Sequence, residues 1–347
     1  MFFDFSKLFS LNIGVDFGSF KTRAVSSETG FFYNKFSLIS LFQKDKTVLA
    51  VGDESKEMVG RVPAGVMVVK PILNSEITSN QFFELFVKDL VKEVSIKNRS
   101  FKFVTKPDFY VTVNSDFTKA QESNFENSLK KEGINKVFFI KKSLVSYQGI
   151  INTTNRQRNS VLIIDIGFNK TDIGLVFNNS LIDAKTLNFG GQDINNIIYQ
   201  KLIEEKKIQV SDENIENYKK NNLILYPNKY DHVKFEIVGK SIRTGLPSKI
   251  EISVVDFREM VLPLIKTNLI NPLKSFINSL SENVSNDIFE HGVELIGGSS
   301  QLFSLKLLLN KEFNIKFNIP KSPENVLIVG LRKVIESQDL IDRFKIN

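Results

Sequence analysis

The chain contains one short pattern twice, and this repeat constrains its fold more than any other feature. An apolar run ends on Asp16, Gly18 follows, and a second run typical of a β-strand begins at Lys21. The same pattern returns at Asp165 and Gly167, between two further apolar runs. Each copy predicts two strands joined by a tight turn, because Asp and Gly both favour turn geometry. Two copies therefore predict two similar domains, each offering one turn and one carboxylate to the same ligand.

The chemistry of such a turn indicates a phosphate ligand. Successive backbone N–H groups in a turn point at phosphate oxygens, and a neighbouring carboxylate suits Mg²⁺, which prefers oxygen ligands and retains several waters. Most isolated Asp-x-Gly hairpins are only turns, so the inference depends on the duplication and on two later glycine pairs. Gly190-Gly191 precedes a helical pattern. Gly297-Gly298 follows an apolar run and precedes a helix expected from Leu302 to Phe313, whose N-terminus favours an anion.

Composition excludes several other classes of protein. The chain has 347 residues, enough for two domains, and no cysteine, which excludes disulfides and zinc–thiolate sites and fits a reducing cytoplasm. No run of ~18 apolar residues is present, so no transmembrane helix is expected. The net charge of +7 is interpreted as a solvated, Lys-rich surface. Its basic residues are not interleaved with aromatic side chains that stack on bases, so no nucleic-acid partner is expected.

Two groups of phenylalanines are candidate membrane contacts. Phe2, Phe5 and Phe9 would share one face of an N-terminal helix, which suits an anchor lying in a membrane surface. Packing of this segment on its own domain is an equally open alternative. Phe101 and Phe103 are a second candidate contact, although aromatic residues in loops more often pack inward.

A local conflict marks one helix start as a place to look for altered function. Thr118 to Gly133 reads as an ordinary helix, with Gln121 placed to complete a capping box. The next helix is expected to open at Lys141 and Lys142. Two lysines there oppose the helix dipole, which favours anions at this end.

In this order, the two hairpins and the two glycine pairs resemble the actin/Hsp70/sugar-kinase ATPase superfamily. Local strings make the chain more closely similar to the MreB family of bacterial actins: Gly60-Arg61-Val62-Pro63, Lys70-Pro71, Gly245-Leu246-Pro247 and the run from Asp287 to Gly292. The abundance of Phe, Lys, Asn and Ile, together with altered site residues, resembles the divergent MreB paralogues of wall-less swimming bacteria.

The resemblance implies an α/β, actin-like ATPase fold of two lobes and four subdomains around a nucleotide cleft. It divides the chain into subdomain IA (1–33, 75–145 and 315–347), subdomain IB (34–74), subdomain IIA (146–180 and 250–314) and subdomain IIB (181–249).

The resemblance also implies roles for individual residues, carried over position by position. The first phosphate loop would be Gly18, Ser19, Phe20, Lys21 and Thr22, and the second Gly167, Phe168, Asn169, Lys170 and Thr171. The adenosine side would comprise Gly190, Gly191, Glu216, Lys219, Gly297, Gly298, Ser299 and Ser300. Asp16 and Asp165 would lie beside Mg²⁺, mainly through water.

Departures from the family pattern fall where hydrolysis would occur. The family's water-activating Glu is Lys142 here, and a Thr of the second loop is Lys170. Phe168 replaces a glycine, which puts the shape of that loop in question because Phe tolerates a positive φ poorly. Groups that activate water contribute about 10²–10⁴-fold to a rate. Lysines that bind the substrate and the transition state equally strongly do not raise the rate and so do not replace that contribution. Weak or lost hydrolysis is therefore expected.

The predicted function is a cytoskeletal protein at the inner face of the cell membrane that binds ATP or ADP and polymerises with itself, for cell shape or motility. Paralogous actin-like proteins are further candidate partners. Three alternatives stay open. The chain would be an active ATPase filament if Glu76 or Asp172 replaced the missing carboxylate. It would otherwise be a small-molecule kinase of the same superfamily, or a membrane adaptor that does not polymerise.

Overall fold

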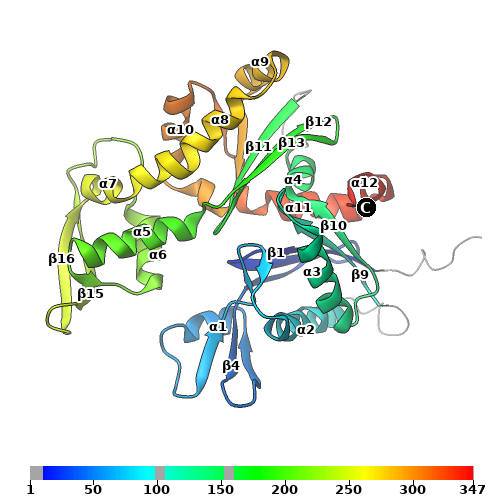
Figure 1. Cartoon of the computed structure of the whole chain (residues 1–347), viewed down its shortest axis with the longest axis horizontal. Coiled ribbons are helices and arrows are strands. Elements are labelled where there is room, and N and C mark those ends of the chain that lie inside the picture. The colour runs from blue at the N-terminus through cyan, green and yellow to red at the C-terminus, as the bar shows by residue number, and fades with distance from the viewer. Residues whose placement is uncertain (1–10, 98–105, 152–159, 347) are drawn as a thin grey trace, which may run out of the picture. The chain divides into compact units, whose positions relative to one another are not determined.

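The computed structural model describes residues 11–97, 106–151 and 160–346. The chain forms two compact units (Figure 1). Unit 1 comprises residues 1–156, 179–182 and 325–347, and unit 2 comprises residues 157–178 and 183–324. The finer boundaries of four subdomains stay a prediction.

Unit 1 is built on a five-stranded sheet of order β10-β9-β1-β2-β3. The Asp-x-Gly hairpin supplies the two antiparallel strands β1 and β2, β3 continues the meander, and β9 and β10 run parallel to β1. The strands are β1 (Asn12–Phe17), β2 (Lys21–Ser26), β3 (Gly30–Phe36), β9 (Asp108–Val113) and β10 (Val137–Lys141). β9 is buried along its whole length, as expected for a strand covered on both faces.

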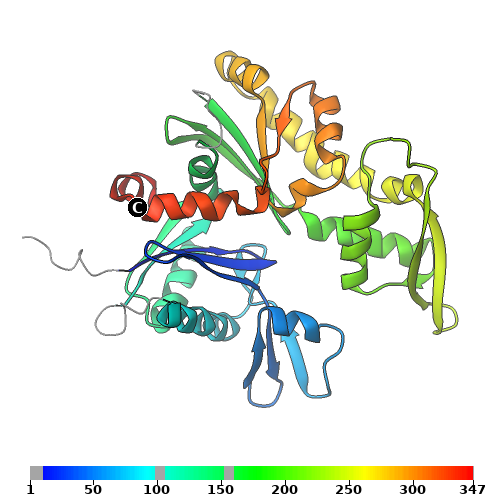
Figure 2. The same ribbon diagram turned by 180° about the vertical axis from the view of Figure 1, so that it is seen from behind.

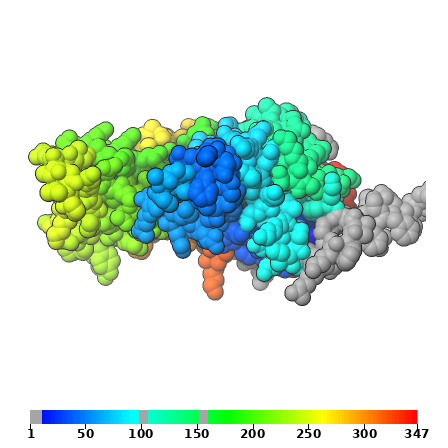
Figure 3. All heavy atoms as spheres, turned by 90° about the horizontal axis from the view of Figure 1, so that it is seen from below, coloured from blue at the N-terminus to red at the C-terminus, as the bar shows by residue number. Residues whose placement is uncertain are grey.

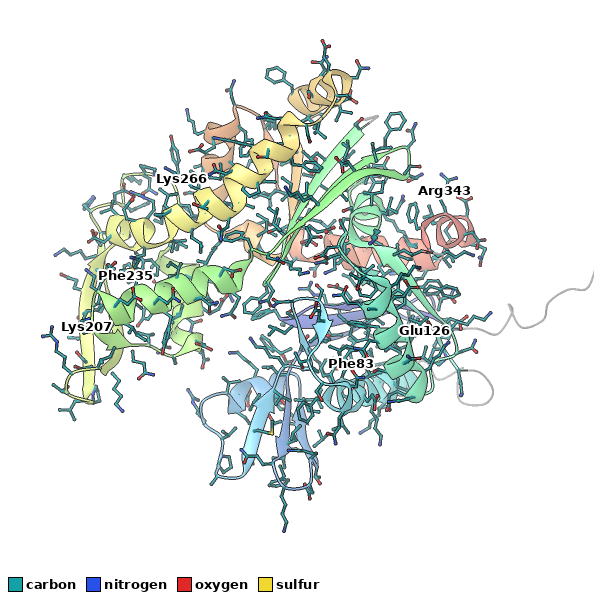
Figure 4. All side chains as sticks on the ribbon, in the orientation of Figure 1. Phe83, Glu126, Lys207, Phe235, Lys266 and Arg343 are labelled. Carbon is teal, nitrogen blue, oxygen red and sulfur yellow. The ribbon has the colours of Figure 1, made fainter. Side chains whose placement is uncertain are left out.

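One face of this sheet packs against α2 (Asn80–Lys97) and α3 (Lys119–Lys131). The odd-numbered side chains of β1 point to this face because side chains alternate along a strand. Figure 4 shows Phe83 between α2 and the sheet, where its ring lies 5.1 Å from the ring of Phe17 in an edge-on arrangement. Burial of these large rings contributes most to the core of the unit.

The capping predicted for α3 is confirmed. The hydroxyl of Thr118 accepts a hydrogen bond from the backbone N–H of Gln121, whose side chain accepts one from the N–H of Thr118. Gly133 follows the last turn with a φ of 89°, a conformation that glycine adopts without strain.

The opposite face of the sheet is covered by α4 (Lys142–Ile151) and α11 (Val326–Ile335), with α12 (Gln338–Phe344) after it. Figure 2 shows α11, in red, lying along β1 and β2. A side chain at Gly14 would meet Leu331 of α11 at 2.5 Å. Asp16 lies two residues further along β1, so its side chain points to the face that α4 and α11 cover.

The rest of unit 1 is a small sheet and two short paired strands. The sheet has the order β5-β4-β6 and is followed along the chain by the pair β7-β8. The elements are β4 (Ile39–Phe42), β5 (Val48–Val51), α1 (Asp53–Met58), β6 (Val66–Val69), β7 (Ile72–Leu73) and β8 (Glu76–Ile77).

Unit 2 repeats the layout of unit 1 around the second Asp-x-Gly hairpin. Its sheet has the order β13-β12-β11-β17-β18, with the hairpin strands antiparallel and the last two strands parallel to β11. The strands are β11 (Ser160–Ile166), β12 (Thr171–Phe177), β13 (Ser180–Leu187), β17 (Val293–Ile296) and β18 (Phe317–Asn318). The repeated pattern in the sequence thus corresponds to a repeated strand order.

Helices and a hairpin complete unit 2. The helices are α5 (Gly191–Glu204), α6 (Asp212–Asn222), α7 (Val254–Ile265), α8 (Asn271–Asn278), α9 (Glu282–His291) and α10 (Leu305–Phe313), with a π-helical segment (Lys266–Ile270) joining α7 to α8. The hairpin consists of β15 (Lys234–Ser241) and β16 (Pro247–Ser253), with β14 (Ile208–Gln209) beside β15. It lies at the surface in yellow-green (Figure 3), and its Phe235 packs edge-on to Phe257 with ring centres 5.3 Å apart. Within the described ranges, no helix combines the length and apolar character that crossing a membrane requires.

Candidate functional site

The first predicted phosphate loop is held in shape by a serine from the next segment. The hydroxyl of Ser37 donates to the backbone oxygen of Gly18 and shares a 2.9 Å hydrogen bond with the hydroxyl of Thr22. Thr22 is fully buried, so its hydroxyl serves the loop's own structure. The backbone of the turn is therefore the part that suits a phosphate. Ser37 was not identified from the sequence, because nothing local links it to the loop.

The two large side chains of this loop contact one ring. Phe20 packs edge-on to Phe36 with ring centres 5.1 Å apart, and the ammonium of Lys21 lies 4.6 Å from the centre of the Phe36 ring. Lys21 and Phe36 are register partners on β2 and β3. A cation over an aromatic face is stabilised by the ring's quadrupole. The Phe36 ring therefore holds the Lys21 side chain at the side of the loop.

Asp16 is the centre of the candidate site in unit 1. Its Oδ1 accepts a 2.9 Å hydrogen bond from the hydroxyl of Thr112 and lies 3.3 Å from the ammonium of Lys142. The three residues come from the carboxyl ends of β1, β9 and β10, which are neighbours in the sheet. Asp16 is only 6% exposed. The parallel strand order therefore brings together three polar groups that lie far apart in the sequence.

The lysines at the start of α4 each have a compensating partner. The ammonium of Lys141 donates to the backbone oxygens of Asn114 at 3.1 Å and Ser115 at 3.0 Å, and Lys142 faces Asp16. A helix start disfavours cations because of the macrodipole, and these oxygens offset that effect. The conflict noted in the sequence is resolved in unit 1 by charge pairing.

The second predicted phosphate loop closes without backbone strain. The N–H of Gly167 donates to the oxygen of Lys170 at 3.0 Å, and none of Phe168, Asn169 and Lys170 has a positive φ. Phe168 therefore fits the turn in spite of replacing a glycine. The hydroxyl of Thr171, fully buried, donates to the oxygen of Phe189 at 2.8 Å and so holds the loop from inside.

The start of α5 is bonded to this loop. The N–H groups of Gly191 and Gln192 donate to the oxygens of Gly167 (3.1 Å) and Phe168 (2.7 Å). The N–H of Gly190 donates to the carboxylate of Asp193 at 2.8 Å. Burial raises the pKa of Asp193, against the lowering effect of this hydrogen bond. These first N–H groups already have acceptors. The two glycines therefore serve to let the backbone at the start of α5 approach the backbone of the loop closely.

The late glycine pair also packs against the second hairpin. Gly297 has a φ of +87°, and a side chain there would collide with the carboxylate of Asp165. The hydroxyl of Ser299 donates to the oxygen of Gly167 at 2.8 Å. That of Ser300 donates to the oxygen of Gly297 at 2.7 Å. Of the predicted adenosine-side residues, Gly190, Gly191 and Ser299 thus contact the second loop.

The helix predicted from Leu302 to Phe313 after the glycine pair is present, but it begins three residues later than predicted. A short 3₁₀ turn (Gly298–Gln301) follows the glycine pair, and α10 begins only at Leu305. Ser304 has a φ of 67° and separates the two. A left-handed residue interrupts helical hydrogen bonding, which the apolar spacing of this segment did not indicate.

Two further predicted adenosine-side residues, Glu216 and Lys219, form an ion pair on α6. The ammonium of Lys219, 4% exposed, lies 2.6 Å from a carboxylate oxygen of Glu216 and donates to the oxygen of Gly191 at 3.0 Å. Asn195 donates to Glu216 at 2.8 Å. Burial opposes ionisation of Glu216, but Lys219 and the hydrogen bonds outweigh it and lower the pKa of Glu216. Burial lowers the pKa of Lys219 despite its partner.

Replacing Glu216 with Gln is expected to destabilise unit 2 by about 3 kcal/mol at neutral pH, because it leaves a buried ammonium without its counter-charge. A carboxylate with a lowered pKa contributes stability above its usual pKa and loses it as pH falls through the lowered value. The difference between parent and variant should therefore shrink in acid. Urea unfolding monitored by tyrosine fluorescence at neutral and acid pH measures it, and a pH-independent difference would contradict the ion-pair account.

The two alternative water-activating carboxylates have structural partners. Glu76 accepts a 3.0 Å hydrogen bond from the side chain of Gln121, and the buried Asp172 accepts one of 2.8 Å from the hydroxyl of Thr186. Among the described residues, no group of three or more His, Asp or Glu side chains is placed to hold a metal ion. The Mg²⁺ roles of Asp16 and Asp165 stay a prediction. The predicted membrane residues Phe2, Phe5, Phe9, Phe101 and Phe103 lie outside the described residues.

Comparison with known proteins finds relatives along nearly the whole chain. A family model described as MreB/Mbl protein matches residues 10–343. The cell shape-determining protein Mbl of Bacillus subtilis is 21% identical over 340 residues, which cover 98% of this chain and all of Mbl. The cell shape-determining protein MreB of Escherichia coli is 22% identical over 341 residues, covering 97% and 96% of the two chains.

Solved structures agree with the predicted fold. MreB5 of Spiroplasma citri, solved with ADP, superposes with a TM-score of 0.86 at 20% identity, covering 96% of this chain and 98% of MreB5. A MamK double helical filament gives a TM-score of 0.76 at 15% identity, covering 94% and 99%. The α/β actin-like fold predicted from the sequence is confirmed. The match of the family model across both units shows that the chain belongs to the MreB/Mbl family.

Proposed function

We propose that this chain binds ATP or ADP and polymerises with itself into membrane-associated filaments that serve cell shape or motility, with weak or lost hydrolysis. MreB5 of S. citri has been solved with ADP and with AMPPNP, and MamK as a double helical filament. Mbl and MreB are cell shape-determining proteins. These properties of relatives support a filament-forming, nucleotide-binding role.

The observation that carries the proposal is the Asp-x-Gly turn of each unit, with its aspartate at the end of a central strand. In unit 2, the backbone around this turn leaves room and polar groups for a ligand. Gly298 has no atom within 4 Å of the position a side chain would take, and Oδ1 of Asn169 is buried without a hydrogen-bond partner. Asn195 also has a buried Oδ1 without a partner, beside Glu216. These features fit a ligand with hydrogen-bonding groups, such as a nucleotide.

Weak hydrolysis follows from the group that occupies position 142. The resemblance assigns that position to a carboxylate that orients or activates water. The structure has an ammonium there, 3.3 Å from Asp16. An ammonium offers donors and no acceptor, so it cannot take a proton from an attacking water. Bound ATP would accordingly persist.

Replacing Gly298 with Leu tests the nucleotide site without disturbing the fold. The open space at this position accommodates the larger side chain, which would then occupy volume that a bound nucleotide needs. We expect ADP affinity to fall by at least about tenfold, which corresponds to a loss of about 1.4 kcal/mol of binding free energy. Fluorescence titration with a labelled ADP measures the change.

Gly298→Ala is the matched control, because a methyl group adds little volume at the same backbone position. It should bind ADP with nearly the parent's affinity, and both variants should melt at the parent's temperature. A Leu variant that keeps both its melting temperature and its ADP affinity would place the nucleotide elsewhere.

A further inference from the structure

We propose that the ammonium of Lys142 takes the place of a divalent cation at Asp16, so that this chain binds a nucleoside polyphosphate with little dependence on Mg²⁺. The inference rests on the proposed nucleotide binding. It goes further by naming the positive group that would bind the phosphates. It concerns residues of unit 1 alone.

Asp16 is already engaged by partners that compete with a metal ion. A single atom, Oδ1, takes both the hydroxyl of Thr112 at 2.9 Å and the ammonium of Lys142 at 3.3 Å. Mg²⁺ binds carboxylate oxygens at about 2.0–2.1 Å in a nearly octahedral shell and keeps several waters. An ammonium this close excludes such a shell from that oxygen. Oδ1 of Asp16 therefore does not fit direct coordination of Mg²⁺, and the ammonium 3.3 Å away also repels an ion held through water.

The position of Lys142 is built into the fold. The residue is the first of α4 and directly follows β10, whose strand pairs with β9 from Val137↔Phe109 to Lys141↔Val113. The preceding Lys141 is fixed by two backbone oxygens. The backbone of Lys142 is therefore held at the end of β10, from where its side chain reaches Asp16. Its attraction to Asp16 is the stronger because both side chains are mostly buried.

The remaining exposure of Lys142 suits contact with an anion. Its side chain is 16% exposed, against 9% for Asp16, so the ammonium is the more accessible of the two groups. Lysine binds phosphate as a point charge with three donors. An ammonium with this exposure can contact an anion in addition to Asp16. Lys142 thus places a cation of the chain itself where Mg²⁺ would otherwise lie between Asp16 and the phosphates.

The charge balance gives the same result. A carboxylate that faces a metal–phosphate complex is neutralised by the metal. Here Asp16 is neutralised by Lys142 within the chain, so a second cation gains less from it and is repelled by the ammonium. Affinity for the polyphosphate should then depend on Lys142 more than on the metal.

The test measures equilibrium binding of ADP and AMPPNP by isothermal titration, with excess Mg²⁺ and with EDTA. Four full-length proteins are compared: the parent, Lys142→Met, Lys142→Glu and the control Lys136→Met, which removes an exposed lysine just before β10. We expect the parent's affinity to differ by less than about threefold between the two buffers. Lys142→Met should bind about tenfold more weakly in EDTA, the size of one lost charge-assisted contact. Lys142→Glu should need Mg²⁺, and Lys136→Met should match the parent.

Binding of Mn²⁺ to the nucleotide-bound protein, followed by electron paramagnetic resonance, gives a second readout. The parent should bind Mn²⁺ more weakly than Lys142→Glu. A parent that loses tenfold or more of its affinity in EDTA would overturn this inference and leave nucleotide binding standing. Equal affinities of the parent and Lys142→Met in EDTA would also overturn it. Absence of nucleotide binding by every protein in both buffers would contradict the proposed function itself.

Discussion

Replacing Lys142 with Glu together with Lys170 with Thr is expected to raise phosphate release from Mg-ATP by at least about 100-fold. The double variant returns a carboxylate and a hydroxyl to the two positions that the family resemblance links to the attacking water. It also removes the ammonium that faces Asp16 at 3.3 Å. The rate is measured at a protein concentration high enough for polymerisation, because the site of this family is proposed to act within a filament.

Two controls separate the causes of that gain. Lys142→Gln removes the positive charge without supplying a base, so it should raise the rate much less than Lys142→Glu does. Asp172→Asn should leave the slow parental rate unchanged, because the carboxylate is buried and accepts a hydrogen bond from Thr186. A parent that already hydrolyses ATP quickly would contradict the assignment of position 142 and would favour the active ATPase.

Replacing Gly330 with Ala is expected to destabilise unit 1 by about 2–4 kcal/mol, in the range of overpacked cores. Gly330 is buried on α11 where this helix crosses α4. A methyl group there would collide with the backbone oxygen of Val145 and lie 2.8 Å from the backbone nitrogen of Gly149. Backbone atoms cannot rotate away, so α11 must shift away from α4. The gain of about 1 kcal/mol in helix propensity offsets only part of this cost.

Val329→Ala is the matched control on the same helix. Val329 is 47% exposed, so its truncation removes little buried surface, and Ala favours the helix. Chemical unfolding followed by circular dichroism should show the transition of unit 1 moving to lower denaturant in Gly330→Ala and staying in place in Val329→Ala. Equal midpoints for Gly330→Ala and the parent would show that α4 and α11 do not pack as closely as described.

Local chemistry explains which parts of the fold could be predicted. Each Asp-x-Gly hairpin was identified because turn residues stand between two apolar runs. The capping box of Thr118 and Gln121 was found because its residues are three apart. The order of strands in each sheet depends on contacts between distant segments, and it was not predicted. The start of α10 was predicted three residues too early because the left-handed conformation of Ser304 leaves no mark in the apolar pattern.

The contacts within the candidate site could be predicted only in part. The sequence singled out Lys142 as a misplaced charge but did not identify Asp16 as its partner. That pairing depends on β1, β9 and β10 ending at the same edge of the sheet. Thr112 and Ser37 were missed for the same reason, since each reaches its partner across strands. Asp193 was missed because a carboxylate three residues into a helix usually faces solvent.

The measurement that tests the account most directly follows polymer and phosphate in the same sample. The protein is mixed with Mg-ATP, filament formation is recorded by light scattering and sedimentation, and released phosphate is recorded at the same times. We predict that polymer accumulates well before the polymerised subunits have each released a phosphate, and that the pelleted filaments retain ATP. Polymer that forms only as fast as phosphate is released, or no polymer under any nucleotide, would contradict the account of a filament with weak hydrolysis.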